Sequence, residues 1–204
     1  MAIRALFPTL LYHNALAKTA GTRFDRTLLD ECQALAATDA AGHRWSAKHY
    51  LGGYTSYGSL DRLHRVSSVF AALARRIAGH VKAIARRLPY DLRSRSLAMT
   101  DCWLNVMPAG VVHSLHLHPT SFISGTYYVQ VPKGAGALKF EDPRLSKMMA
   151  APPGRSFVSV PAKAGDVILF ESWLRHEVPP ARYAGERISI SFNYAWSAKK
   201  GSAR

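Results

Sequence analysis

Cysteine is scarce in this chain. The only two, Cys32 and Cys102, stand far apart and outside any Cys-x-x-Cys motif. This spacing argues against a disulfide framework and against a thiolate zinc site. We therefore expect both thiols to be free and the protein to be cytoplasmic.

Acidic residues are also few, 13 against 27 Lys and Arg, which gives a formal net charge of +14. A surface of this sign attracts anions such as phosphates or nucleic acid, although basic side chains are at least as often simply solvated. The sequence has no recognisable stacking or zinc motif of a nucleic-acid-binding module. A nucleic-acid partner is therefore open as an alternative but is not favoured.

Long apolar runs are missing too. The N-terminal MAIRALFPTLLYHNAL is interrupted by Pro8 and His13, and no run approaches the ~18 apolar residues of a membrane span. We expect a strand over Ala5–Tyr12, no secretory signal and no membrane partner. A glycine-rich phosphate loop is absent as well, because GGYTSYG lacks the lysine and the helix context that such a loop needs.

An aromatic segment lies between Gly42 and Gly58. Its paired glycines, Gly52 and Gly53, are typical of a loop or short strand and not of a helix. The aromatic residues are equally suited to forming a substrate lip and to capping the core.

Two helix patterns occupy the first half of the chain. Asp25–Ala37 has apolar residues on one side at helical spacing. A longer apolar stripe runs without a break from Asp61 to the stop at Pro89, and the opposite face is strongly basic. We expect these helices to support a sheet, with His64 and His80 playing no part in metal binding.

Short strands separated by Pro and Gly follow Pro89, a pattern of a sandwich or jelly roll. We expect strands at Leu97–Met107, Val111–His116, Phe122–Val131, Ala137–Phe140, Ser156–Val160, Val167–Phe170, Arg175–Val178 and Arg187–Ala195. The predicted fold is mainly β with a helical buttress, a cupin-like double-stranded β-helix. It forms one domain over residues 1–204, with helical support over about 25–88 and the barrel over about 97–196.

Three histidines, His113, His116 and His118, fall within six residues ahead of one of these strands. In an extended segment, residues two apart point the same way, so His116 and His118 can aim at one point. The only later histidine, His176, is the candidate third ligand. Such an open three-ligand site suits non-heme Fe(II) oxygenases, whereas a His-rich exposed turn is the plainer alternative.

The segment ERISISFNYAW alternates as a strand should. Ile188, Ile190, Phe192 and Tyr194 share one face, and Arg187, Ser189, Ser191 and Asn193 share the other. An Arg with a Ser two residues along can hold a carboxylate, the guanidinium bidentately and the hydroxyl as a further donor. A structural pairing of Arg187 with Asp166 is the alternative.

With these motifs the sequence resembles the Fe(II)- and 2-oxoglutarate-dependent oxygenases. The matching features are Pro108–Gly110 before the histidine pair, the YYV strand at Tyr127–Val129, GDVILF before His176, and Arg187-x-Ser189. More narrowly it resembles a bacterial and phage group that carries HxHP, SGxYYV, FEDPR and RISISFN.

The resemblance implies Fe(II) held by His116, His118 and His176, and 2-oxoglutarate anchored by Arg187 and Ser189. It also implies hydroxylation of an unidentified small-molecule or peptide substrate. A tyrosine equivalent to Tyr128 lies beside the co-substrate in the family, which would turn Tyr127 outward. Strand alternation adds Asn105 to the pocket, on the side shared with Trp103 and Met107.

The sequence departs from the wider family at one ligand. The usual near pair is His-x-Asp or His-x-Glu, whereas His118 stands here at the second position, with Asp142 of FEDPR as the alternative ligand. Imidazole also suits Zn, Cu and Ni. A cupin-like metal protein that does not use 2-oxoglutarate is the second hypothesis, but it leaves Arg187 and Ser189 without a function.

Overall fold

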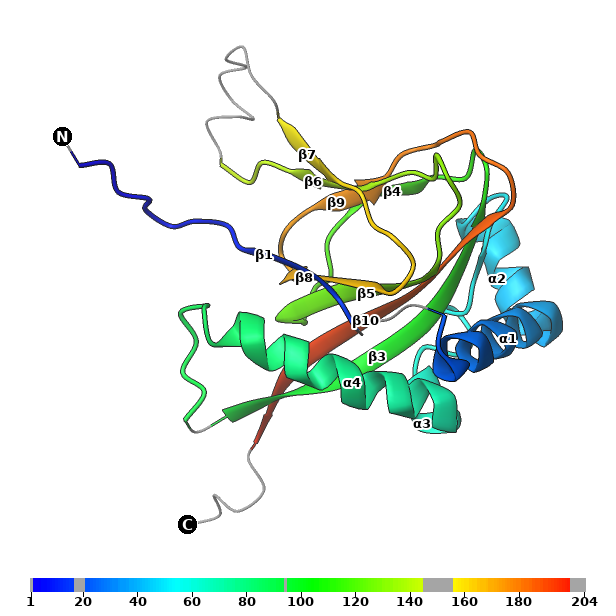
Figure 1. Ribbon diagram of the computed structural model, residues 1–204, viewed down its shortest axis with the longest axis horizontal. Coiled ribbons are helices and arrows are strands. Elements are labelled where there is room, and N and C mark those ends of the chain that lie inside the picture. The colour runs from blue at the N-terminus through cyan, green and yellow to red at the C-terminus, as the bar shows by residue number, and fades with distance from the viewer. Residues whose placement is uncertain (1, 17–20, 94, 145–155, 199–204) are drawn as a thin grey trace.

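A computed structural model describes residues 2–16, 21–93, 95–144 and 156–198 (Figure 1). The helices are α1 (Arg23–Thr38), α2 (Ala40–His49), α3 (Leu63–Val66) and α4 (Ser68–Ala85). The strands are β1 (Leu11–Ala15), β2 (Tyr54–Thr55), β3 (Arg95–Pro108), β4 (His113–His116), β5 (Ile123–Gln130), β6 (Leu138–Glu141), β7 (Phe157–Val160), β8 (Asp166–Glu171), β9 (His176–Val178) and β10 (Glu186–Ala198).

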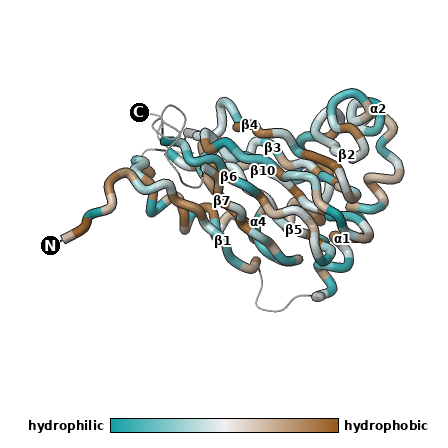
Figure 2. The backbone as a smooth tube through the Cα atoms, turned by 90° about the horizontal axis from the view of Figure 1, so that it is seen from above, coloured by the Kyte–Doolittle hydropathy of each residue, from teal (hydrophilic) through white to brown (hydrophobic). Residues whose placement is uncertain are grey.

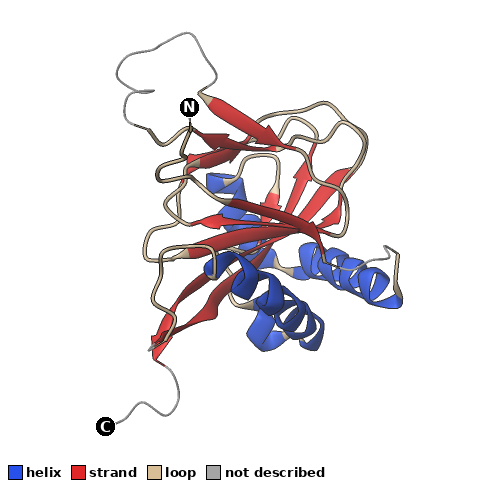
Figure 3. Cartoon of the chain, turned by 60° about the vertical axis from the view of Figure 1, so that its left-hand side comes forward, coloured by secondary structure: helices blue, strands red, loops and turns tan. Residues whose placement is uncertain are grey.

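These strands form two antiparallel sheets. The larger has the order β1-β8-β5-β10-β3-β2, and the smaller has the order β4-β9-β6-β7. Figure 1 shows the small sheet above the large one, with α1, α3 and α4 below it; Figure 3 shows the same layers with strands in red. The prediction of a mainly β fold with helices on one side is confirmed.

Side chains on the two faces of the large sheet pack in two separate hydrophobic cores. On β8, Val167 and Leu169 face the helices, whereas Ile168 and Phe170 pack in the second cluster, which includes Phe140 and Val178 of the small sheet. The first cluster joins the large sheet to buried residues of α1 and α4 such as Leu28 and Ile77. The large sheet is therefore buried on both faces, by the helices on one side and by the small sheet on the other.

The alternation predicted for β10 is confirmed. Its four apolar residues, Ile188, Ile190, Phe192 and Tyr194, all belong to the helix-side core. The opposite face therefore points between the two sheets and carries the buried polar residues Arg187, Ser189, Ser191 and Asn193. Tyr127 likewise faces away from the space between the sheets, but it is 2% exposed beneath the helices and so does not point to solvent.

The helix predictions need two corrections. The helix at Asp25–Ala37 is confirmed as α1, which starts two residues earlier at a Thr22–Asp25 capping box. The segment from Gly42 to Gly58 is not all loop, because α2 occupies Ala40–His49 and is capped by the Asp39 side chain, which accepts from Gly42 N. Asp39 precedes the predicted loop, so the composition of residues 42–58 does not indicate where this helix starts.

The long helix is interrupted at Ser67, which is extended (φ −127°, ψ 134°) and caps α4 by accepting from Phe70 N. The apolar stripe continues across this break in the sequence, so periodicity alone missed it. One consequence is that Val66, placed on the apolar face by its spacing, is 68% exposed. Beyond the break the stripe is buried as expected, from Phe70 to Leu88.

All eight strands predicted after Pro89 are present, with ends within three residues of the predicted ones. The predicted N-terminal strand was misplaced, because β1 begins at Leu11, where pairing with Phe170 of β8 starts. The preceding residues extend away from the molecule, and Phe7 is 98% exposed (Figure 2). Both cysteines are free and buried. Among the described residues, no helix is long and apolar enough to cross a membrane.

Candidate metal centre

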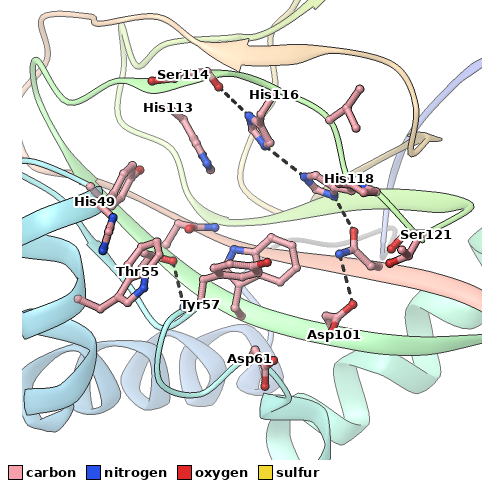
Figure 4. Close-up of a pocket in the computed structure, with 18 of the residues that line it drawn as sticks. His49, Thr55, Tyr57, Asp61, Asp101, His113, Ser114, His116, His118 and Ser121 are labelled. Carbon is pink, nitrogen blue, oxygen red and sulfur yellow. Dashed lines mark hydrogen bonds between the residues drawn. The ribbon is translucent and has the colours of Figure 1, made fainter.

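Three histidines converge between the sheets. His116 ends β4, His118 follows in the next loop, and His176 begins β9, where it pairs with His116 across the small sheet. One ring nitrogen from each lies within 4.8 Å of the others. Figure 4 shows His116 and His118 pointing toward one another, with 3.2 Å between their Nε2 atoms. Among the described residues, no other group of His, Cys, Asp or Glu has the geometry to hold a metal ion.

The Nδ1 atom of each of these imidazoles faces an oxygen. His116 Nδ1 donates to Ser114 O at 2.6 Å, and His176 Nδ1 donates to Leu174 O at 2.9 Å. His118 Nδ1 donates to the side-chain Oδ1 of Asn193 at 2.6 Å. Because Nδ1 carries the proton in all three rings, each Nε2 retains its lone pair, which is how histidines are oriented for a metal.

Burial keeps these imidazoles neutral. It lowers the pKa of His118 to about 4 and that of His176 to about 2, and the neighbouring imidazoles act in the same direction. Burial lowers the pKa of His116 as well. Neutral imidazole is the form that ligates a metal, so the three rings are ready to bind at neutral pH.

A second layer of hydrogen bonds fixes His118. Asn193 Nδ2 donates to Asp101 at 3.3 Å, so its Oδ1 must face the imidazole, and Ser124 Oγ also donates to that Oδ1 at 2.8 Å. Strand alternation in the sequence places Asn193 on the polar face of its strand and Ser124 on the same side as Tyr128, but it assigns neither a function and does not single out Asp101. Strand alternation was the signal for Asn193, whereas the contribution of Asp101 required the pairing of β3 with β10.

The predicted co-substrate residues lie next to the histidines. Ser189 pairs across the sheet with Asn105 on β3 and with Tyr128 on β5, and Arg187 is the next inward residue along β10. A small inner cavity of about 20 Å³ is bordered by all three histidines, Asn105, Arg187 and Ser189. The Arg187 guanidinium also lies over the Tyr128 ring, 5.0 Å from its centroid. The fold therefore brings all seven residues singled out in the sequence to one place.

Arg187 is buried without an acidic partner among the described residues. It is 3% exposed, its Nη1 lies 3.4 Å from Ser189 Oγ, and its Nε has no hydrogen-bond partner. Asp166, the alternative partner considered for it, instead binds His13 and Lys163 N. A nearby buried donor, Tyr128 OH, is also unpartnered. Such groups are costly to bury alone, so this cluster is built to receive a polar, anionic ligand.

Asp142, the alternative metal ligand, does not join the histidines. It lies after β6, where its side chain accepts a hydrogen bond from Arg144 Nε and its backbone N–H donates to Ser156 O. It borders a different cavity, together with N-terminal residues such as Phe7.

A larger outer cavity of about 440 Å³ opens beside the histidines. His113, His116 and His118 form one wall, and residues from α2, β3 and the loop after β2 form the others (Figure 4). His113 stacks on His116 with 4.6 Å between ring centroids, and it borders both cavities together with Trp103 and Asn105. These residues separate the outer cavity from the inner one.

The segment that carries these residues matches a known family. Residues 101–193 match the family model described as "Putative 2OG-Fe(II) oxygenase". That segment includes all three histidines, Asn105, Tyr128, Arg187 and Ser189. No curated protein matches the sequence.

Solved structures share the fold over 92% of this chain. They include the non-heme alpha ketoglutarate dependent epimerase SnoN from nogalamycin biosynthesis (18% identity, TM-score 0.68, 76% of that chain). A prolyl-4-hydroxylase from Pseudomonas putida matches with 18% identity and a TM-score of 0.62 over 92% of its length. HygX from Streptomyces hygroscopicus, with nickel, 2-oxoglutarate and hygromycin B bound, matches with 15% identity and a TM-score of 0.64 over 83% of its length.

At these identities the likeness shows the fold, which is that of the 2-oxoglutarate oxygenase jelly roll. The segment 101–193 is thus similar to the 2OG-Fe(II) oxygenase family, and the solved structures show the fold over 92% of the chain. The donor set also fits the metal of that family, since three neutral imidazoles with free Nε2 atoms suit iron.

Proposed function

We propose that this protein is an Fe(II)- and 2-oxoglutarate-dependent oxygenase that hydroxylates an organic substrate. His116, His118 and His176 hold the iron, while Arg187 and Ser189 anchor the distal carboxylate of 2-oxoglutarate. Tyr128 and Asn105 complete the co-substrate pocket. Asp142, which accepts from the Arg144 side chain away from the histidines, has no part in this assignment.

The observation that carries the proposal is the buried guanidinium of Arg187. A buried cation without an acidic partner among the described residues is unfavourable unless a ligand supplies the negative charge. Its planar fork suits a carboxylate, and Ser189 and the Tyr128 hydroxyl are close enough to add hydrogen bonds. A cupin-like protein without an acidic co-substrate has no use for this arrangement.

When bound, the iron couples conversion of 2-oxoglutarate and O₂ into succinate and CO₂ to insertion of the second oxygen atom into a substrate C–H bond. The protein residues bind and orient the reactants. The Nδ1–H donors of the three histidines hold the rings so that each Nε2 faces one point.

The ligand set of three imidazoles has an electrostatic consequence. Neutral ligands leave both positive charges of Fe(II) unbalanced, so an anionic co-substrate binds with more Coulombic attraction than at a site with a carboxylate ligand. The Asp101 carboxylate is linked to His118 through hydrogen bonds of Asn193. Its negative charge partly replaces that of a carboxylate ligand and increases the basicity of His118.

Co-substrate binding requires rearrangement at the inner cavity. Its volume of about 20 Å³ has room for roughly one water molecule, which is less than 2-oxoglutarate needs. Trp103, Asn105 and His113 border both cavities, so movement of their side chains joins the inner space to the outer one. Rotamer changes of this kind are common on ligand binding.

We assign the whole chain, residues 1–204, to one domain, with helical support over about 25–88 and a distorted barrel over about 97–196. Membership of the narrower bacterial and phage group, and a cytoplasmic location, belong to the same proposal. Among the structural neighbours, HygX is seen with hygromycin B bound and a prolyl hydroxylase from Trichoplax adhaerens is seen in complex with a peptide fragment. A small molecule or a peptide is therefore the substrate class to test.

An anaerobic titration tests this function. Adding 2-oxoglutarate to the Fe(II)-loaded protein under nitrogen should produce a visible metal-to-ligand charge-transfer band, and admitting oxygen should convert 2-oxoglutarate to succinate. The same titration without added iron is the control. If the loaded protein gives neither band nor succinate, the cupin-like alternative replaces this proposal.

A further inference from the structure

The outer cavity has a charge opposite to that of the protein as a whole. The chain has 27 Lys and Arg against 13 acidic residues. Among the described residues that line this cavity, however, there is no Lys or Arg, and the two charged side chains are Asp61 and Asp101. The cavity lies against His113, His116 and His118, where the proposed function places the substrate.

These two carboxylates differ in their hydrogen bonds. Asp101 accepts hydrogen bonds from Thr100 Oγ1 at 2.7 Å and from Asn193 Nδ2 at 3.3 Å, and so belongs to the support of His118. The Asp61 side chain, which lines the cavity from the loop before α3, makes no hydrogen bond or ion pair within the described part of the chain. It is only partly exposed. Asp61 is therefore the carboxylate available to a ligand.

Aromatic rings form a continuous wall beside Asp61. Trp45 contacts Tyr57 edge-on at 5.9 Å between centroids, and Tyr57 contacts Trp103 edge-on at 5.1 Å. Trp103 in turn lies 5.8 Å from the ring of His118. We call Trp45, Tyr57 and Trp103 the aromatic wall. It leads from the rim of the cavity, where Tyr57 is 50% exposed, to a proposed iron ligand.

A buried polar atom at the cavity independently indicates a ligand. Asn105 is 2% exposed and borders the outer cavity, and its Oδ1 has no hydrogen-bond partner. Its Nδ2 donates to Ser191 Oγ at 3.1 Å, which leaves the carbonyl oxygen as the unused end of the amide. An unpaired buried acceptor of this kind favours a donor on the bound molecule.

From these features we propose that the substrate is a weakly hydrated organic cation, such as an alkylated ammonium or a guanidinium compound. Its charge pairs with Asp61 and lies against the aromatic wall, since aromatic faces attract cations and carbon-substituted cations lose little hydration on contact. The remainder of the substrate extends along Trp103 toward His118. That the bound cation is the substrate of the reaction rests on the proposed function, whereas its binding in the outer cavity does not.

Choline and 3,3-dimethyl-1-butanol form a test pair, because they have nearly the same shape and differ in charge. Their affinities can be measured by quenching of tryptophan fluorescence, since Trp45 and Trp103 line the cavity. The full chain, loaded with Fe(II) and 2-oxoglutarate under nitrogen, should bind choline about tenfold more tightly than its neutral counterpart. The quaternary nitrogen has no lone pair for the metal and both probes carry the same hydroxyl, so the difference between their affinities reports the effect of the charge.

Asp61→Asn should remove most of this preference for the cation, and Tyr57→Leu should reduce choline binding while keeping an apolar surface. Asp30→Asn is the matched control, because Asp30 is an exposed acid on α1 outside the cavity and its loss changes the net charge equally. Equal affinities for the two probes in the wild type would overturn the proposal. So would a preference that Asp61→Asn leaves intact.

The same samples separate this inference from the proposed function. If the charge-transfer band of 2-oxoglutarate forms but choline binds no more tightly than its neutral counterpart, the enzyme assignment holds and the inference of a cationic substrate is wrong. If choline binds preferentially and no band forms, the cavity recognises a cation but the oxygenase assignment fails.

Discussion

Asn193 accepts a hydrogen bond from His118, with 2.6 Å between Oδ1 and Nδ1, and the neighbouring Asp101 determines which end of the amide faces the ring. This contact links a loop histidine to the inward face of β10. It makes the orientation of a proposed metal ligand depend on the pairing of β10 with β3.

Replacing Asn193 by Ala should lower iron affinity by about 10–100-fold, the usual cost of losing a hydrogen-bond partner of a ligating histidine. The ring of His118 would still be present but less restrained. Competition with a chelator measures the change. Ser191→Ala is the matched control on the same strand face, since Ser191 contacts Asn105 and not a histidine.

Replacing His176 or His116 by Ala should abolish iron binding, because two imidazoles do not complete the site. Iron per chain, measured after desalting, should fall from roughly one to near zero. His49→Ala should retain the metal, since His49 borders the outer cavity but lies outside the group of three. Unchanged iron in the His176 variant would count against the whole site.

Arg187→Lys keeps the positive charge but loses the planar fork. A charge-assisted hydrogen bond contributes about 1.5–3 kcal/mol, so the 2-oxoglutarate requirement should rise roughly ten- to a hundredfold, and more in Arg187→Ala. The iron content should stay the same. The charge-transfer band measures the affinity, and Arg86→Lys at the exposed C-cap of α4 is the control. Equal 2-oxoglutarate affinity in Arg187→Ala would contradict the assignment.

Gly125→Ala should destabilise the protein by about 1–3 kcal/mol, the usual cost of overpacking. A Cβ there would lie 2.5 Å from Leu169 Cδ2 and 2.7 Å from the Phe192 ring, in the core between the large sheet and the helices. Gly79→Ala is the matched control, because Gly79 lies within α4 with nothing within 4 Å of the added atom. It should raise stability by up to about 1 kcal/mol. Urea unfolding of the two variants measures both effects.

Local patterns in the sequence were enough to predict the strands and to select residues that the fold brings together. Alternation on β10 separated Ile188 from Arg187, and the spacing of His116 and His118 placed both rings on one side. These features depend on periodicity and on residue chemistry, which a single sequence contains. The sequence also predicted the general fold, because strands at short spacing have few ways to bury both faces.

Features that depend on pairing between distant segments were not predictable. The second-layer contact of Asp101 with Asn193 follows from the register of β3 with β10, and the outer cavity joins Asp61 to rings from α2 and β3. Helix α2 and the break at Ser67 were missed because single capping side chains, and not hydrophobic spacing, decide where these helices start.

Because the two faces of β10 lie in different environments, insertions and deletions in or just before this strand should not be tolerated. Adjacent residues of the strand belong to different compartments, Arg187 to the ligand side and Ile188 to the helix side. Deleting one residue ahead of them would turn the guanidinium into the apolar core and bring isoleucine to the co-substrate. The segment from Arg187 to Asn193, which is buried on both faces, should therefore tolerate no insertion or deletion in related chains.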